Sequence, residues 1–361
     1  MTTRKLRVLV VEDSHTVRRR ICEALTSDPN LEIVGEADNG QRAIELCQSL
    51  RPDVLTLDMI LPIMSGLSAT EYIMAHCPTP ILIVSASTNR GELFKTYDAL
   101  AAGAVDVLDK PRGDATDDDW NQRLVAAVRL VAKIKVITHP RARLALSRGA
   151  SGSARPPVRD ALSTTSKAPL SLVALGASTG GPSALVSVLR DLPSQPGLLV
   201  LLVLHIDEPF GSAFAEWLSE QTPHAVKFAQ GGELVEGEAA RVLMAAPGRH
   251  LIVEGNRLAL DYSPERHSCR PSIDTLFESI ALHAGPRSAA ALLTGMGRDG
   301  ATGLLALRQA GGFTVAQDEE TSIVYGMPRE AALLGAATRV LPLGEIGRCL
   351  ADAIKTRARS A

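Results

Sequence analysis

The sequence contains no paired cysteines, no long hydrophobic run and no large excess of either charge. Its five cysteines are scattered without a C-x-x-C pair, which favours reduced thiols in a cytoplasm over a disulfide framework. The longest apolar run, at residues 197–204, is far too short to cross a bilayer. Residues 1–7 carry charge and lead into an apolar run, so we expect no signal peptide. These absences predict a soluble cytoplasmic protein without direct membrane insertion.

The charge balance also limits the partners. The formal net charge is −2, so no overall basic field attracts the chain to nucleic acid or anionic lipid. Hydrophobic residues make up 45% of the chain and charged residues 22%, which is typical of a soluble globular protein. Because 361 residues exceed one ordinary core, we expect two domains and no nucleic-acid partner.

Short apolar runs alternate with helical patterns over residues 1–135. The predicted strands are 6–11, 31–37, 54–57, 81–85 and 105–108. The predicted helices include 17–26 and 41–49, and a last helix near 118–134 has apolar residues at helical spacing. This alternation predicts an α/β domain over residues 1–135, a doubly wound parallel sheet with helices on both faces.

A change of composition separates this part from the rest. Residues 136–168 are rich in Arg, Ser, Ala, Gly and Pro without an apolar period, which predicts a flexible linker. The α/β alternation then resumes, with predicted strands at 172–175, 198–205, 289–293 and 314–316. We therefore expect a second α/β domain with a mainly parallel sheet over residues 169–361.

Polar side chains follow the ends of the strands in the first domain. Glu12 and Asp13 end the first strand, Asp58 follows the third, Ser85 ends the fourth and Lys110 follows the fifth. The carboxyl ends of parallel strands meet at one edge of a sheet, and carboxylates there suit Mg2+. One such residue is more often a turn residue, but the ordered set predicts phosphoryl transfer to a carboxylate.

In these residues the chain resembles the response-regulator receiver family, over about residues 5–130. The resemblance implies that Asp58 accepts a phosphoryl group from a histidine kinase. Glu12 and Asp13 would hold Mg2+ together with Asp58. Ser85 and Lys110 would contact the phosphoryl group.

A glycine-rich turn follows the first strand of the second domain. Its sequence, GASTGGP from Gly176, contains a G-x-S-x-G pattern, and Pro182 suits the first turn of a following helix. Ser178 would lie at a helix N-terminus, where unpaired N–H groups favour a developing oxyanion. Such turns also bind phosphate or only pack, so the pattern alone leaves a nucleophilic serine as one of several interpretations.

A nucleophilic serine needs a base and a residue that orients it. His205, at the end of the next predicted strand, is the first candidate for the base, with His250 and His267 as rivals. The third member could be Asp299 in another glycine-rich turn, where the alternative is a helix N-cap. The spacing alone does not distinguish Asp299 from Asp207 or Asp274. Cys269 is expected to be a packing or loop thiol.

From about residue 170 to its end the chain resembles the catalytic domain of the chemotaxis receptor-glutamate methylesterase (CheB) family. The segments that carry the resemblance are GASTGG from Gly176, AFAEWL from Ala213, PGRHL from Pro247, CRPSIDTLFES from Cys269, LTGMGRDG from Leu293 and VYGMPREA from Val324. The resemblance implies a triad of Ser178, His205 and Asp299. It also implies that the backbone N–H of Met296 and groups near Thr179 support the oxyanion.

The family resemblance implies a function as well. The substrates would be glutamate γ-methyl esters on methyl-accepting chemoreceptors, with deamidation of receptor glutamines as a second activity, and the esterase reaction would need no cofactor. Phosphorylation by the kinase of the receptor array would activate the enzyme. Three departures from the family patterns, at Ile60, Val107 and Ile206-Asp207, are expected to affect the receiver switch and the rim of the cleft.

Two other interpretations come from different classes. A receiver with a DNA-binding or scaffolding output would act by docking, but the sequence contains no basic recognition helix. An unrelated lipase-like hydrolase would need a deep apolar acyl pocket.

Overall fold

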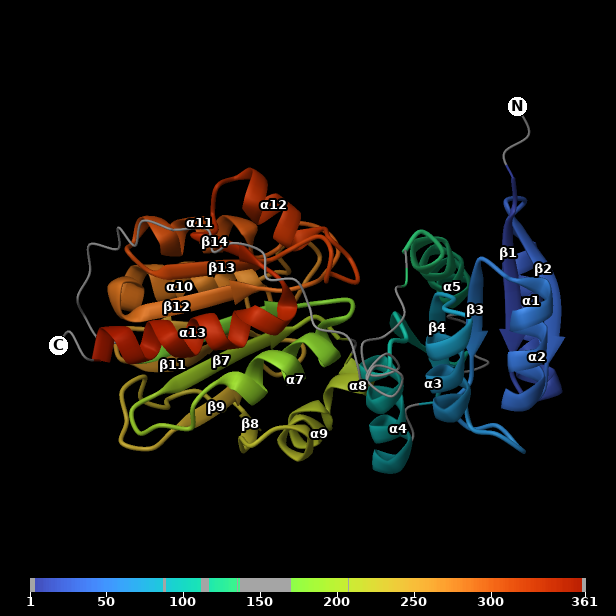
Figure 1. Ribbon diagram of the computed structural model, residues 1–361, viewed down its shortest axis with the longest axis horizontal. Helices are drawn as coiled ribbons and strands as arrows, with labels where there is room; N and C mark the ends of the chain where they lie inside the picture. The colour runs from blue at the N-terminus through green and yellow to red at the C-terminus, as the bar shows by residue number, and fades with distance from the viewer. Residues whose placement is uncertain are drawn as a thin grey trace, which may run out of the picture. The chain divides into compact units, whose positions relative to one another are not determined.

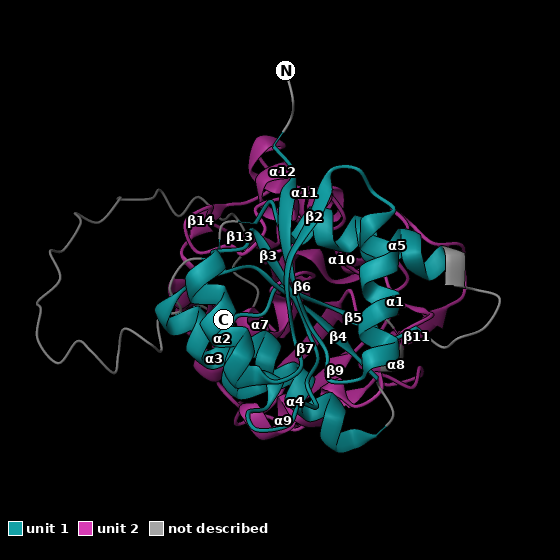
Figure 2. Ribbon diagram, turned by 90° about the vertical axis from the view of Figure 1, so that its right-hand side faces the viewer, with its two compact units in different colours: residues 1–157 teal, residues 158–361 magenta. Residues whose placement is uncertain are grey.

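A computed structural model describes residues 4–86, 89–111, 117–134, 136, 170–206 and 208–358. The chain divides into two compact units, residues 1–157 and 158–361 (Figure 2). Each unit has its own buried apolar core around a sheet of alternating strands and helices, which confirms the predicted α/β class. The predicted linker lies outside the described residues except for residue 136. The boundaries of the two domains stay predictions.

Unit 1 contains a five-stranded parallel sheet in the order β2-β1-β3-β4-β5 (Figure 1). Its strands are β1 (Leu6–Val11), β2 (Leu31–Ala37), β3 (Val54–Leu57), β4 (Ile81–Ser85) and β5 (Asp106–Asp109). Its helices are α1 (His15–Thr26), α2 (Gly40–Leu50), α3 (Gly66–His76), α4 (Arg90–Ala101) and α5 (Asp117–Val131). The predicted bounds of the first four strands are confirmed, and β5 lies one residue later than predicted.

The local sequence explains these elements. β3 and β4 are apolar along nearly their whole length and buried throughout, as expected for parallel strands covered on both faces. Helices α1 to α4 each begin after a Ser or Asn whose side chain accepts a hydrogen bond from a backbone N–H of the first turn. The result is a sheet whose carboxyl edge carries the polar residues of the first predicted site.

Unit 2 contains a seven-stranded parallel sheet in the order β14-β13-β12-β6-β7-β9-β8 and an antiparallel hairpin, β10-β11. Its strands are β6 (Leu172–Ala177), β7 (Leu199–Leu204), β8 (Val226–Phe228), β9 (Arg241–Met244), β10 (His250–Glu254), β11 (Arg257–Asp261), β12 (Ser288–Leu292), β13 (Phe313–Gln317) and β14 (Arg339–Leu341). Its helices are α7 (Gly181–Asp191), α8 (Glu208–Gly211), α9 (Phe214–Gln221), α10 (Ile273–Ala284), the 3-10 turn η1 (Gly285–Arg287), α11 (Ala301–Gln309), α12 (Met327–Leu333) and α13 (Leu343–Ala358).

The strand order places the predicted catalytic residues together. The first strand of the unit, β6, lies between β12 and β7. The strands that follow β6 lie toward one edge of the sheet, and the strands that follow β12 lie toward the opposite edge, so the order in which strands are added reverses between β6 and β12. The crevice at such a reversal, outside the carboxyl ends of the strands, is the usual ligand site of an open parallel sheet. Ser178 follows β6, His205 follows β7, and Asp299 lies in the turn after β12.

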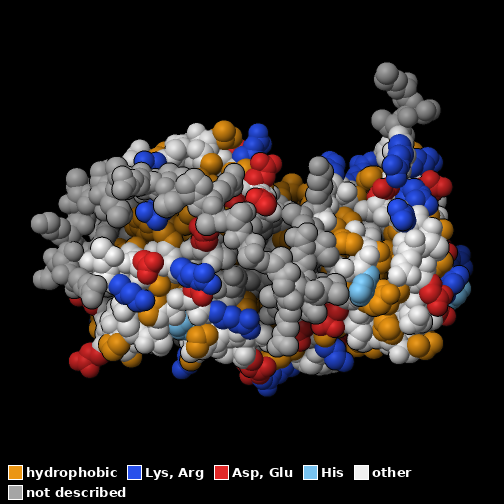
Figure 3. All heavy atoms as spheres, in the orientation of Figure 1, with side chains coloured by type: hydrophobic (Ala, Val, Ile, Leu, Met, Phe, Trp, Pro, Cys, Tyr) orange, Lys and Arg blue, Asp and Glu red, His pale blue; other side chains and the backbone are white. Residues whose placement is uncertain are grey.

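On the face shown in Figure 3, acidic and basic side chains are interspersed, and charge of neither sign dominates. This agrees with the small net charge of the chain. Among the described helices, none has the length and the apolar character needed to cross a membrane.

Candidate active site

Asp299 lies in the glycine-rich turn between β12 and α11 and is 2% exposed. Its carboxylate is held by the start of α10. Ser272 Oγ donates to Oδ1 at 2.8 Å, and the backbone N–H groups of Ile273 and Asp274 donate at 2.7 and 3.1 Å. These donors and the positive end of the helix stabilise the ionised carboxylate. Because Gly300 is the N-cap residue of α11, the alternative of Asp299 as an N-cap is wrong.

His205 comes directly after β7, and its ring contacts Asp299. Nε2 of His205 lies 2.9 Å from Oδ2 of Asp299, and the histidine side chain is 14% exposed. Burial lowers the pKa of His205, but the hydrogen bonds with Asp299 and Cys269 outweigh burial and raise the pKa to about 9. Burial in turn raises the pKa of Asp299, but the hydrogen bond and charge of His205 hold it below its usual range. Each side chain therefore stabilises the charged form of the other.

Ser178 lies in the turn between β6 and α7. Its backbone N–H donates to the carbonyl of Thr294 at 3.0 Å, and its carbonyl accepts from the N–H of Gly181 at 2.6 Å. Gly180 has a φ of 77°, a conformation that favours glycine and lets the chain turn into the helix. Within the described residues, the hydroxyl of Ser178 and the ring of His205 are not hydrogen-bonded. Catalytic hydrogen bonds of this kind often form only when substrate is present.

The two residues predicted to support an oxyanion lie close to Ser178 along the chain or in space. Thr179 is buried, and its carbonyl accepts a hydrogen bond from Thr294 Oγ1 at 3.0 Å. Met296 follows Gly295, where an added Cβ would lie 2.7 Å from Cβ of Ser178. The loop that carries the Met296 N–H therefore passes directly beside Ser178. The donor roles of Thr179 and Met296 stay predictions.

The rival bases have other partners. His250 is buried, and its Nδ1 accepts a hydrogen bond from the backbone N–H of Ser272 at 3.0 Å. His267 Nε2 lies 3.1 Å from Oδ2 of Asp274, so Asp274 pairs with this histidine and not with the base predicted first. The remaining rival, Asp207, lies outside the described residues.

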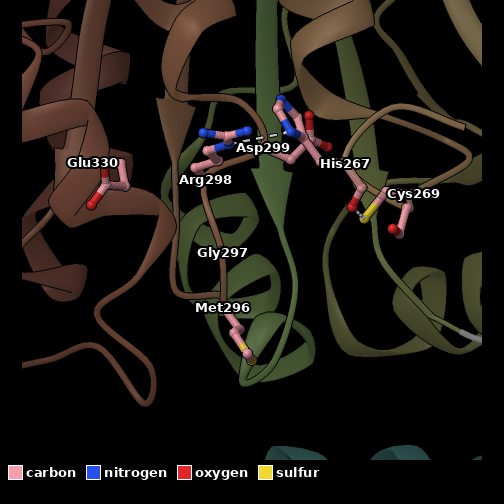
Figure 4. A pocket seen from close by; sticks show the side chains of 8 residues that line it. His267, Cys269, Met296, Gly297, Arg298, Asp299 and Glu330 are labelled. Atoms are coloured by element: carbon pink, nitrogen blue, oxygen red, sulfur yellow. Dashed lines mark hydrogen bonds between the residues drawn. The ribbon is translucent and has the colours of Figure 1, made fainter.

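A pocket of about 520 Å³ opens beside Asp299 (Figure 4). Its lining consists of His267, Ser268, Cys269, Met296, Gly297, Arg298, Asp299 and Glu330. The guanidinium of Arg298 points at the ring of His267, with Nε 3.4 Å from Nδ1. Glu330 comes from α12, a separate element. The pocket thus presents a cation, an anion and an apolar side chain next to the candidate catalytic carboxylate.

Cys269 has a larger place in this site than the sequence predicted. Its Sγ lies 3.6 Å from Nδ1 of His205. Reciprocal backbone hydrogen bonds between Arg266 and Cys269, at 3.1 and 2.9 Å, close a tight turn. The two central residues, His267 and Ser268, have φ values of 53° and 59°, which non-glycine residues rarely adopt. The expectation of a simple packing or loop thiol therefore missed its contact with the candidate base.

Sequence reasoning also missed the polar residues that fix the turns. Ser272 could have been identified as a helix N-cap from its place before an apolar helical run, but not as a donor to a distant carboxylate. Gln317, fully buried at the end of β13, accepts a hydrogen bond from the backbone N–H of Thr294 at 2.8 Å. Only the strand order brings these residues beside Ser178 and Asp299.

A second cluster lies at the carboxyl edge of the unit 1 sheet. Lys110 Nζ donates to Oε1 of Glu12 at 3.0 Å and lies 2.9 Å from Oδ2 of Asp58. Ligand atoms of Glu12, Asp13 and Asp58 lie within 4.8 Å of one another. Ser85 is buried at the end of β4, and its carbonyl accepts the backbone N–H of Lys110 at 3.1 Å. The structure therefore brings the predicted receiver residues to one edge.

The carboxylates of this cluster suit a hard divalent cation. Burial raises the pKa of both Glu12 and Asp58, although Lys110 opposes this effect. Burial also lowers the pKa of Lys110, but its bonds to the two carboxylates outweigh this and raise it. Oε2 of Glu12 and both oxygens of Asp58 are buried without a well-aligned hydrogen bond. These carboxylate oxygens, with the exposed Asp13 beside them, fit the oxygen ligands that Mg2+ prefers.

Known proteins resemble the chain over its whole length. Residues 173–350 match the CheB methylesterase family, and residues 8–116 match the response regulator receiver domain. A protein-glutamate methylesterase/protein-glutamine glutaminase of Nitrosospira multiformis is 39% identical over 98% of this chain and 99% of its own length. A protein of the same description from Anaeromyxobacter dehalogenans is 40% identical over 97% of each chain.

Among solved structures, the CheB methylesterase catalytic domain of Thermotoga maritima is 31% identical, with a TM-score of 0.48. It covers 50% of this chain and 97% of its own. Both resemblances inferred from the sequence are confirmed by the family matches and the relatives. The chain belongs to the CheB methylesterase family and carries an N-terminal response regulator receiver domain.

Proposed function

We propose that the chain is a protein-glutamate methylesterase and protein-glutamine glutaminase whose activity is raised by phosphorylation of its receiver domain. The substrates are γ-methyl esters of glutamate, and side-chain amides of glutamine, on methyl-accepting chemoreceptors. The observation that carries the proposal is the pairing of His205 with Asp299 at 2.9 Å beside the Ser178 turn. The relatives, similar over nearly the full chain, bear this double activity in their names.

The geometry supports an acyl transfer through a serine ester. Ser178 Oγ attacks the ester carbonyl, and its proton passes to Nδ1 of His205, since Nε2 is engaged by Asp299. The negative oxygen that forms is stabilised by donors in the turns of Thr179 and Met296. As the tetrahedral intermediate collapses, the imidazolium delivers the proton to the leaving ester oxygen, which departs as methanol, or to the leaving amide nitrogen of a glutamine, which departs as ammonia.

Hydrolysis of the acyl-enzyme repeats the same proton transfers. His205 takes a proton from a water molecule that attacks the acyl carbonyl, and the proton then returns to Oγ of Ser178. The product is a receptor glutamate, so each turnover restores one negative charge. Asp299 keeps the imidazole in one orientation throughout and stabilises its charged form.

In the receiver, we assign Asp58 as the residue that takes a phosphoryl group from a histidine kinase of the receptor array. Glu12, Asp13 and Asp58 would hold Mg2+, which supplies positive charge against the phosphoryl oxygens when bound. Lys110, already between Glu12 and Asp58, would then contact the phosphoryl group, as would Ser85. Phosphorylation acts by shifting the population between a less active and a more active state.

The test is methanol release from a methylated receptor cytoplasmic fragment. Ser178→Ala should lower the rate by about three orders of magnitude or more, because the covalent route is removed while the fold is kept. Binding of the fragment should persist in this variant. Release that continues at the wild-type rate in Ser178→Ala would refute the assignment. No release by the folded wild-type protein would favour the docking alternative.

A further inference from the structure

The thiol of Cys269 lies next to the imidazole of His205 and has no part in the proposed esterase reaction. Sγ of Cys269 lies 3.6 Å from Nδ1 of His205, and ligand atoms of His205, Cys269 and Asp299 all lie within 4.8 Å of one another. Cys269 is partly exposed and lines the pocket of Figure 4, and the histidine side chain keeps 14% of its surface exposed. The thiol therefore borders the pocket, and His205 lies directly beside it.

The separation of the two atoms suits a tetrahedral metal ion. Bonds of about 2.3 Å from zinc to sulfur and about 2.0–2.1 Å from zinc to nitrogen, at a tetrahedral angle, place the two ligand atoms about 3.6 Å apart. The observed distance of 3.6 Å is close to this value. Thiolate and imidazole are also ligand types that suit zinc, whereas harder cations prefer oxygen ligands.

The hydrogen bond of His205 with a carboxylate is of the kind that metal-bound histidines usually make. A histidine that binds a metal through one ring nitrogen usually donates its other N–H to a carboxylate, which fixes the ring. Here Nε2 of His205 lies 2.9 Å from Asp299, and that carboxylate is held by Ser272 and two backbone N–H groups. This second observation is independent of the cysteine and leaves Nδ1 as the nitrogen for a ligand.

The cysteine is also held in place. The turn that presents Cys269 has two consecutive non-glycine residues with positive φ, His267 and Ser268. It is anchored by the bond from His267 to Asp274 and by the bidentate pair of Arg266 with Glu278. Strained backbone of this kind persists only where the surrounding structure fixes it, and it clusters at functional sites.

We propose that Sγ of Cys269 and Nδ1 of His205 bind a thiophilic divalent cation such as Zn2+, and that the bound ion inhibits the esterase. The ion binds the thiolate and the neutral imidazole, so binding releases the protons that these two groups carry and occupies the nitrogen that must accept the proton of Ser178. Water molecules complete the coordination. The inhibition rests on the function proposed above, whereas the binding itself does not depend on it.

The first experiment measures binding on the full-length protein. Zn2+ is titrated in competition with a chromogenic chelator, in excess Mg2+ so that the receiver carboxylates do not contribute. Co2+ serves as a spectroscopic probe, because a thiolate ligand gives it a charge-transfer band. We expect Cys269→Ser and His205→Gln each to weaken Zn2+ binding at least about tenfold and to remove the cobalt band. Cys349→Ser, a matched change in the same unit, should behave as wild type.

Two outcomes would overturn the binding site. One is Zn2+ binding by Cys269→Ser that equals wild type, and the other is a cobalt spectrum without a thiolate band, which would leave only a weak thiol hydrogen bond to His205. Cys269→Ala is measured in parallel, so that a folding defect of the serine variant does not decide the result. Zn2+ binding equal to wild type in both Cys269→Ser and Cys269→Ala would likewise overturn the binding site.

The second experiment measures inhibition. Methanol release by each variant is normalised to its own rate without zinc. At the Zn2+ concentration that halves the wild-type rate, Cys269→Ser should keep most of its activity. A bound ion that leaves the wild-type rate unchanged would contradict the inhibitory role. If no variant releases methanol, the proposed function fails, while the binding experiment still decides the metal site.

Discussion

At the scale of single residues, the candidate active site depends on the hydrogen bond between the imidazole of His205 and the carboxylate of Asp299. His205 and Asp299 stabilise each other in the charged state, and the start of α10 supplies three donors to the carboxylate. This arrangement orients the imidazole, but it also makes His205 a stronger base than an isolated histidine.

The raised pKa of His205 determines the pH dependence. A general base acts in its neutral form, which is populated above its pKa, so kcat/KM should rise with pH and level off only near about 9. Ser178→Ala measured at each pH provides the rate of spontaneous ester hydrolysis to subtract. A profile already level above about 6.5, the ordinary value for histidine, would show that the imidazole is not stabilised in this way.

Ser272 should matter for catalysis although its side chain is fully buried and is not itself a candidate nucleophile or base. Its fully buried hydroxyl donates to Asp299 at 2.8 Å, and hydrogen bonds to charged groups contribute about 1.5–3 kcal/mol. We expect Ser272→Ala to lower kcat by about one to two orders of magnitude with little change in KM. Ser279→Ala is the matched control, because this α10 serine bonds the backbone of Val253 instead. Equal activity of both variants would remove Ser272 from the site.

At the scale of elements, strands with strong buried runs could be predicted and the shorter ones could not. The bounds of β1 to β4 follow from the sequence, and β6, β7, β12 and β13 differ from prediction by one or two residues at their ends. The strands β8, β9 and β14 were missed, because runs of three or four residues carry little periodicity. The β10-β11 hairpin was also missed, although Gly255-Asn256 between its strands is a recognised two-residue turn signal.

The candidate active site likewise contains residues whose place could be predicted from the sequence and residues whose place could not. Ser178, His205 and Asp299 each follow a strand, so their place at one edge could be inferred from the α/β alternation and the family resemblance. The contact of Cys269 with His205 could not, because it depends on a turn whose central residues, His267 and Ser268, adopt a conformation that their residue types disfavour.

Close packing of two turns gives a prediction at this scale. An added Cβ at Gly295 would lie 2.7 Å from Cβ of Ser178 and 2.4 Å from Cε of Met327. Gly295→Ala should therefore displace the serine turn, lower kcat at least about tenfold and destabilise the fold by about 1–3 kcal/mol. The control is Gly344→Ala in α13, where an added Cβ meets nothing within 4 Å. Thermal unfolding and methanol release are measured on both, and wild-type activity of Gly295→Ala would show that the turns do not need this contact.

At the scale of the whole molecule, the chain joins two sheets that each carry their polar residues at the carboxyl edge. The receiver edge holds buried carboxylates beside Lys110, and the esterase edge holds the histidine and aspartate beside Ser178. We propose that the two units communicate, with phosphate at Asp58 as the signal and ester hydrolysis as the response.

Control of the esterase by the receiver can be tested by methanol release from the full-length protein with and without a small-molecule phosphodonor and Mg2+. We expect the phosphodonor to raise the wild-type rate, and we expect Asp58→Asn to keep the basal rate but lose the increase. Because Asp58→Asn keeps the size of the side chain and removes only the acceptor carboxylate, a changed fold does not explain its loss of response. An equal increase in the variant, or none in the wild-type protein, would contradict control of the esterase by phosphorylation at Asp58.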